Sequence, residues 1–82
     1  MYLARVYVTL KPSVNDPQGS TIQGGLKMLG FGSVADVRMG KFLELRLDEA
    51  DQDAAEARVD EMCRRLLANP VIEDYRFEVT PV

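Results

Sequence analysis

Histidine is missing from this chain of 82 residues, and cysteine occurs once, at Cys63. The absence of histidine removes the commonest metal ligand and the commonest general base in proteins. A single cysteine cannot form a disulfide within the chain, which favours a reducing, cytoplasmic compartment. A catalytic thiol needs a base or an electropositive setting, whereas Arg64, next to Cys63, points elsewhere around a helix. We therefore expect Cys63 to be a small core residue.

Long apolar runs and an excess of basic charge are also missing. No stretch approaches the roughly 18 apolar residues of a membrane span, and we expect no signal peptide at the start of the sequence. The formal net charge is −3, which argues against nucleic acid or an anionic membrane as the main partner. Chains of this size bury only about 60–65% of their unfolded surface. We expect one domain with a thin core, for which oligomerisation is a common remedy.

Alternating apolar and polar residues predict four strands, over residues 2–11, 34–39, 42–47 and 71–79. Residues 40–41 are predicted to form a break or a tight turn between the second and third strands, and so short a connection favours an antiparallel hairpin.

Two helices are predicted between the strands. Asp16 is the N-cap of the first helix, Pro17 occupies its first position, and Gly30 ends it. The second helix opens in the acidic stretch 48–53 and stops at Asn69 and Pro70. Its predicted apolar stripe consists of Ala55, Val59, Met62 and Leu66.

The resulting β-α-β-β-α-β order predicts an α+β protein with a ferredoxin-like antiparallel sheet and both helices on one face. The opposite face is expected to present Leu3, Tyr7, Phe42 and Ile72 among charged residues of both signs. Such a mixture favours a protein interface over an ordinary solvated sheet with cross-strand ion pairs.

Other groups of residues favour structural roles. The glycines at positions 24, 25, 30 and 32 do not match a P-loop or a dinucleotide-binding fingerprint. We interpret Gly24 and Gly25 as sites of close helix packing. The carboxylates between residues 48 and 53 lack the pattern of a calcium loop and are typical of a solvated helix start.

The whole chain resembles the PurS family of phosphoribosylformylglycinamidine synthase subunits. The segments that carry this resemblance are Val6–Lys11, Asp16–Gly19, Val37–Phe42 and Leu66–Tyr75. The run Asn69-Pro70-Val71-Ile72-Glu73-Asp74-Tyr75 is the most specific of them. The acidic, alanine-rich stretch 48–57 and the pair Gly24-Gly25 depart from the family pattern.

The resemblance implies a non-catalytic subunit of a complex that makes formylglycinamidine ribonucleotide in purine biosynthesis. The implied partners are a PurQ-type glutaminase and a PurL-type synthetase, which this subunit bridges while ammonia passes between them. ATP, magnesium and glutamine belong to the complex, and no cofactor is expected on this chain. Self-association to a dimer or tetramer is also implied. We expect partner contacts at the helix entry, the turn and the start of the last strand: Asp16, Gln18, Arg38, Gly40, Lys41, Asn69, Glu73, Asp74 and Tyr75.

Two other function classes share this order of elements, and an independent enzyme is a third alternative. A regulatory domain that senses a small ligand is the main alternative. An RNA-recognition domain needs further aromatic residues where this chain has Glu44, and a more basic surface. An independent enzyme lacks recognisable catalytic residues here.

Overall fold

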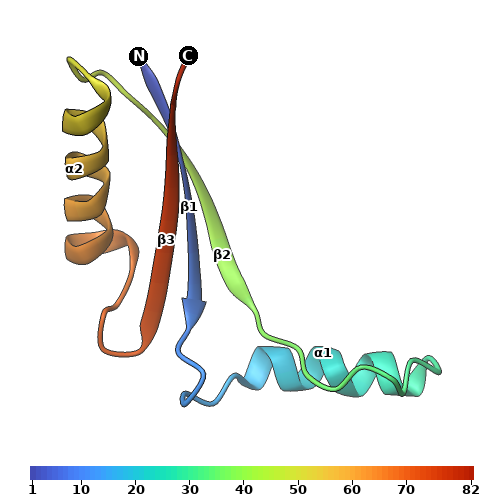
Figure 1. Ribbon diagram of the computed structural model, residues 1–82. Helices are drawn as coiled ribbons and strands as arrows, with labels where there is room; N and C mark the ends of the chain where they lie inside the picture. Colours follow the sequence, from blue (N-terminus) through green and yellow to red (C-terminus); the bar gives the residue numbers. More distant parts are fainter.

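The computed structural model describes all 82 residues, which form a three-stranded antiparallel sheet and two helices (Figure 1). The strands are β1 (Tyr2–Leu10), β2 (Gly40–Leu47) and β3 (Glu73–Pro81), in the order β2-β1-β3. The helices are α1 (Pro17–Met28) and α2 (Gln52–Met62), and α2 continues into a π-helical turn, η1 (Cys63–Leu67). The predicted α+β class and the antiparallel sheet with two helices are confirmed.

The core lies between α2 and the face of the sheet that α2 covers, which we call the inner face. β1 is the central strand, and its inner residues Ala4, Val6 and Val8 are almost completely buried. In the register, Val6 lies opposite Leu43 of β2 and Phe77 of β3. The alternation that defines a half-buried strand therefore fixes which side chains enter the core.

The N-terminal part of α2 follows the sequence prediction closely. The Asp51 side chain caps the helix by accepting a hydrogen bond from the Ala54 amide at 2.8 Å. Ala55, Val59 and Cys63 recur every four residues and are fully buried, so the core role predicted for Cys63 is confirmed.

The apolar stripe ends earlier than predicted, because the helix widens into η1. There the Ala68 amide donates to the Cys63 carbonyl, five residues back, which shifts later side chains around the axis. Leu66 is consequently 82% exposed, and its predicted place in the core is wrong.

α1 points away from the sheet instead of lying on it (Figure 1). It begins at Pro17 with Asp16 as its N-cap, as predicted, and Gly30 follows its end with a φ of 96°. Residues beyond the helix run back beside it. The Gln23 amide fastens this return segment by donating to the carbonyl oxygens of Val34 and Ala35 at 3.3 and 2.9 Å. We call residues 12–39 the arm.

The strand predicted over residues 34–39 is absent, because this segment has no neighbouring strand with which to form a ladder. Gly40 and Lys41 are the first residues of β2, so the predicted hairpin turn is also wrong. A Cβ placed on Gly24 or Gly25 would meet no atom of a distant residue within 4 Å. The predicted close packing at these two glycines is therefore absent within this chain.

The arm makes the molecule elongated. The radius of gyration is 16.2 Å, whereas a compact chain of this length is expected to have about 12 Å. Met1 and Val82 lie side by side at the end of the sheet opposite the arm, where the Val82 amide donates to the Met1 carbonyl (Figure 1). Neither helix has the length and apolar character required to cross a membrane.

Candidate docking site at the base of the arm

The three regions predicted as partner contacts meet where the arm leaves the sheet. Asp16 and Gln18 from the helix entry, Gly40 and Lys41 from the start of β2, and Glu73 from the start of β3 line one hollow of about 260 Å³. These residues are far apart in sequence, so the sheet register and the arm bring them together. We call this hollow and its rim the base of the arm.

Asp16 holds the base of the arm together from the inside. Its side chain is 5% exposed and accepts hydrogen bonds from the Gly19 amide at 2.9 Å and the Met39 amide at 2.8 Å. These two bonds, with that from Gly19 the stronger influence, hold the pKa of the Asp16 carboxyl below its usual value. The residue therefore joins the outgoing helix to the returning segment and leaves little surface for a partner.

Arg38 reinforces the same junction. Its Nη2 donates to the carbonyl oxygens of Lys11 at 2.8 Å, Val14 at 3.1 Å and Leu10 at 3.4 Å. These bonds fix the loop between β1 and α1. A partner carboxylate would have to use the remaining N–H groups of the guanidinium.

The turn before β3 is held by its own side chains. The Asn69 side chain accepts from the Val71 amide at 3.1 Å, and the Glu73 carboxylate accepts from the Asn69 amide at 2.6 Å. Asp74 forms an ion pair with Lys11 at 3.4 Å. As a result the turn projects Val71, which is 79% exposed, toward solvent.

Tyr75 connects β3 to α2. Its hydroxyl donates to the Asp60 carboxylate at 2.6 Å, and Arg64 donates to the other oxygen of that carboxylate at 2.9 Å. The bond from Tyr75 is the main reason that the pKa of Asp60 lies below its usual value, and the same bond raises the pKa of Tyr75. The Tyr75 hydroxyl is thus already hydrogen-bonded within the chain.

The remaining predicted residues face solvent. Gln18, Gly40, Lys41 and Asp74 are exposed, and Lys41 has no carboxylate within ion-pair distance. Lys41 is therefore an exposed cation without an ion-pair partner at the base of the arm.

A second hollow lies on the face of the sheet that α2 does not cover, which we call the outer face. This hollow borders the base of the arm. It has a volume of about 350 Å³, and its walls include Tyr7, Phe42 and Arg76. The sequence predicts that Tyr7 and Phe42 share this face. It does not reveal that the Arg76 guanidinium stacks over the Tyr7 ring, 4.0 Å from its centroid, because that contact depends on the register of β1 with β3.

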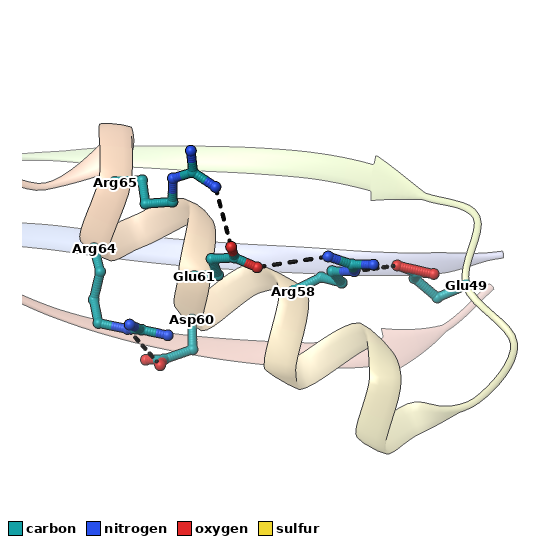
Figure 2. Close-up of polar contacts among 6 residues, drawn as sticks. All are labelled: Glu49, Arg58, Asp60, Glu61, Arg64 and Arg65. Carbon is teal, nitrogen blue, oxygen red and sulfur yellow. Dashed lines mark hydrogen bonds and ion pairs between the residues drawn. The ribbon is translucent and has the colours of Figure 1, made fainter.

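The outward surface of α2 has a different character, because its charges pair with one another (Figure 2). Arg58 contacts both Glu49 and Glu61, at 3.3 and 3.5 Å, and Arg65 contacts Glu61 at 3.1 Å. Such exposed pairs contribute little to stability. They leave few unpaired charges for a partner on this surface, in contrast to the base of the arm and the outer face.

The structure contains no cluster of three or more Cys, Asp or Glu side chains placed to hold a metal ion. The only thiol, that of Cys63, is fully buried, and burial raises its pKa. Cys63 is therefore a core residue and does not line the base of the arm.

Comparison with known proteins gives a consistent result. The family model PurS, described as phosphoribosylformylglycinamidine (FGAM) synthase, matches residues 3–81. The chain is 52% identical to the phosphoribosylformylglycinamidine synthase subunit PurS of Bacillus subtilis, over 100% of this chain and 96% of that protein. It is 40% identical to the PurS subunit of Methanocaldococcus jannaschii, over 100% and 99% of the two chains.

Solved structures agree over the whole length, arm included. Bacillus subtilis PurS has a TM-score of 0.88 at 52% identity and covers 99% of this chain and 100% of its own. Methanocaldococcus jannaschii PurS has a TM-score of 0.89 at 41% identity, with coverage of 100% and 99%. A chain in the structure of PurLQS from Thermotoga maritima has a TM-score of 0.86 at 28% identity, with coverage of 98% and 99%.

Proposed function

The chain belongs to the PurS family of phosphoribosylformylglycinamidine synthase subunits, and from this membership we propose that it bridges a PurQ-type glutaminase and a PurL-type synthetase and supports ammonia transfer between them. The family identified from the sequence is confirmed, and it places the chain in purine biosynthesis. In this proposal ATP, magnesium and glutamine are bound by the other subunits, in the cytoplasm, and this chain binds no cofactor.

The non-catalytic role is supported chiefly by the burial of Cys63. Release of ammonia from glutamine by a thiol requires an accessible, activated thiolate. Here the single thiol is fully buried with a raised pKa, and the chain has no histidine to act as its base. The chemistry therefore belongs to partners that this chain positions.

Self-association is part of the proposal, because the arm exposes apolar surface that the chain cannot cover itself. Ile22, Met28, Leu29 and Phe31 are 40%, 90%, 74% and 54% exposed. A cluster of this kind on a protruding helix is typical of an interface. Another molecule of the same chain is a partner that is always present in solution.

The inner face of the sheet offers a matching surface. α2 packs over β1 and β3, and the inner residues of β2 remain only half-buried: Leu43, Leu45 and Leu47. A ferredoxin-like fold would place α1 there, and in this chain α1 lies in the arm. The arm of a second copy is apolar enough to cover this part of the sheet.

The bridging role is tested by reconstitution with the synthetase and glutaminase of the same organism. Leaving out this chain should abolish glutamine-dependent formation of formylglycinamidine ribonucleotide, while the rate with added ammonium should stay close to that of the full complex. If the glutamine-dependent rate is equal with and without the chain, the proposed role is wrong. A melting-shift screen of the chain alone with amino acids and nucleotides tests the alternative of a small-ligand sensor.

The residues at the base of the arm are tested separately. Lys41→Glu should weaken co-purification with the partners, since Lys41 is the exposed, unpaired cation there. Arg38 is a poor choice for charge reversal, because its loss would release the loop that it holds. Unchanged co-purification of the Lys41 variant would remove this residue from the interface.

Self-association is measured by sedimentation. The double variant Met28→Gln/Leu29→Gln should sediment at a lower mass than the wild-type chain at equal concentration, with an unchanged circular dichroism spectrum. Ser33→Gln, at an exposed polar position of the arm, is the matched control and should sediment like the wild type.

A further inference from the structure

The outer face of the sheet holds an aromatic and cationic groove next to the base of the arm. Phe42, Tyr7 and Arg76 form one row across the three strands, since Tyr7 pairs with Phe42 on one side and with Arg76 on the other. The Tyr7 and Phe42 rings lie with centroids 5.0 Å apart, tilted by 32°. We call the hollow beside this row the outer groove.

The outer groove is open because the next row on this face has no side chain at its β2 position. Gly40 lies opposite Thr9 in the register, and a Cβ at this position would come within 2.3 Å of the Val8 carbonyl oxygen. The strand therefore accepts only glycine here without moving. The missing side chain leaves one edge of Phe42 uncovered, and Phe42 is 52% exposed.

The Arg76 guanidinium is held in place by stacking but has only a weak ion-pair partner. Its guanidinium lies over Tyr7 at 4.0 Å, and its nearest carboxylate is Glu78 at 4.0 Å, the limit of an ion pair. The other acidic residue at the groove, Asp74, is paired with Lys11 at 3.4 Å. A guanidinium held by stacking keeps its N–H donors available for a planar carboxylate.

We propose that the outer groove docks a segment of one partner subunit that presents an apolar side chain next to a carboxylate. The apolar side chain packs against Phe42 above Gly40, and the carboxylate pairs with Arg76. The volume of about 350 Å³ suits one or two side chains of such a segment. Stacked aromatic residues and arginine are the residue types that dominate binding energy at protein interfaces.

A partner subunit, and not a second copy, is the occupant because the molecule has two separate uncovered surfaces. The arm carries the apolar surface that we assign to a second copy, and it projects beyond the end of the sheet (Figure 1). The outer groove lies on the sheet itself, on the face that α2 does not cover. A subunit that joins other proteins needs a surface that its own copies leave free. This inference rests on the proposed bridging function.

The test compares Arg76→Glu and Phe42→Thr with Arg46→Glu. Arg46 lies on the same face, opposite Leu3 at the other end of the sheet, so it carries the same charge change away from the groove. Affinity of the chain for the purified synthetase and for the purified glutaminase is measured by biolayer interferometry. Melting temperatures and sedimentation of each variant alone establish its fold and its oligomeric state.

Each groove variant should weaken binding to one of the two partners by about tenfold or more, with Arg46→Glu within about twofold of the wild type. Wild-type affinity of both groove variants for both partners would overturn the inference. A lowered sedimentation mass with unchanged partner binding would also overturn it, by assigning the groove to a second copy. Failure of the wild-type chain to bind either partner would instead refute the proposed function.

Discussion

Replacing Gly19 by alanine should loosen the arm from the sheet. A Cβ at this position would lie 2.1 Å from the Val37 carbonyl oxygen and 3.0 Å from an Asp16 carboxylate oxygen. Ordinary contacts between such atoms are about 3.5 Å, so the return segment must move. That movement pulls the Met39 amide away from Asp16, which now accepts its hydrogen bond at 2.8 Å.

The size of the effect follows from two opposing contributions. Overpacking a tight site costs about 1–3 kcal/mol, and an alanine in a helix is favoured over glycine by up to about 1 kcal/mol. Because the obstructing atom belongs to the backbone, we expect the cost to exceed the gain, with a net loss of about 1 kcal/mol in the free energy of unfolding.

The measurement is urea unfolding at one fixed protein concentration, combined with hydrogen exchange of the Met39 amide. Gly19→Ala should lower the urea midpoint and speed exchange at Met39. Gly24→Ala is the matched control, since no distant atom lies within 4 Å of the position its Cβ would take. It should raise stability by about 0.5–1 kcal/mol. A Gly19→Ala protein as stable as the Gly24→Ala protein would refute the reasoning.

The core and its border lead to three further predictions. Val59→Ala, at a fully buried position, should lower the free energy of unfolding by about 2 kcal/mol. Val71→Ala, at a 79% exposed position, should change it by no more than about 0.5 kcal/mol. Equal urea midpoints for the two variants would contradict the predicted difference. Because the pKa of Asp60 is lowered in the folded protein, chiefly by Tyr75, its contribution to stability is present above about pH 4 and is lost as the pH falls through the folded-state pKa. Tyr75→Phe should therefore lose less stability than the wild type between about pH 5 and pH 3, and parallel losses in urea titrations contradict the assignment. Cys63 should react with Ellman's reagent only after denaturation, since it is fully buried with a raised pKa; a reaction at the rate of a free thiol in the folded protein contradicts the core role.

Local signals in the sequence predicted the elements well. Asp16 and Pro17 mark the start of α1 because capping depends on residues that are close in the chain. The alternation from Tyr2 onward predicted β1 for the same reason. The α+β class followed from the order of these elements.

The arm was not predictable from the same signals. Residues 34–39 alternate like a strand, but a strand also needs a neighbour, and pairing is a long-range property that the pattern does not contain. The residues predicted as partner contacts come together only in part. Asp16, Lys41 and Glu73 do converge, whereas the roles of Asp16 and Arg38 inside the arm junction depend on contacts between segments more than 20 residues apart. Arg76 was missed as a groove residue because its stacking depends on strand register.

The adjacency of Met1 and Val82 determines how this protein can be engineered and immobilised. An affinity tag or fluorophore attached at Met1 or Val82 lies at the end of the molecule opposite the arm, so a surface-bound chain presents its arm to solution. A linker of a few residues between these ends, with new ends opened among residues 30–33 at the arm tip, would give a circular permutant. In that permutant the helix and the return segment of the arm become two separate tails, held together by the side-chain bonds of Gln23 and Asp16. Self-association of this permutant, compared with that of the wild-type chain, would show how much of the arm's stiffness comes from chain continuity.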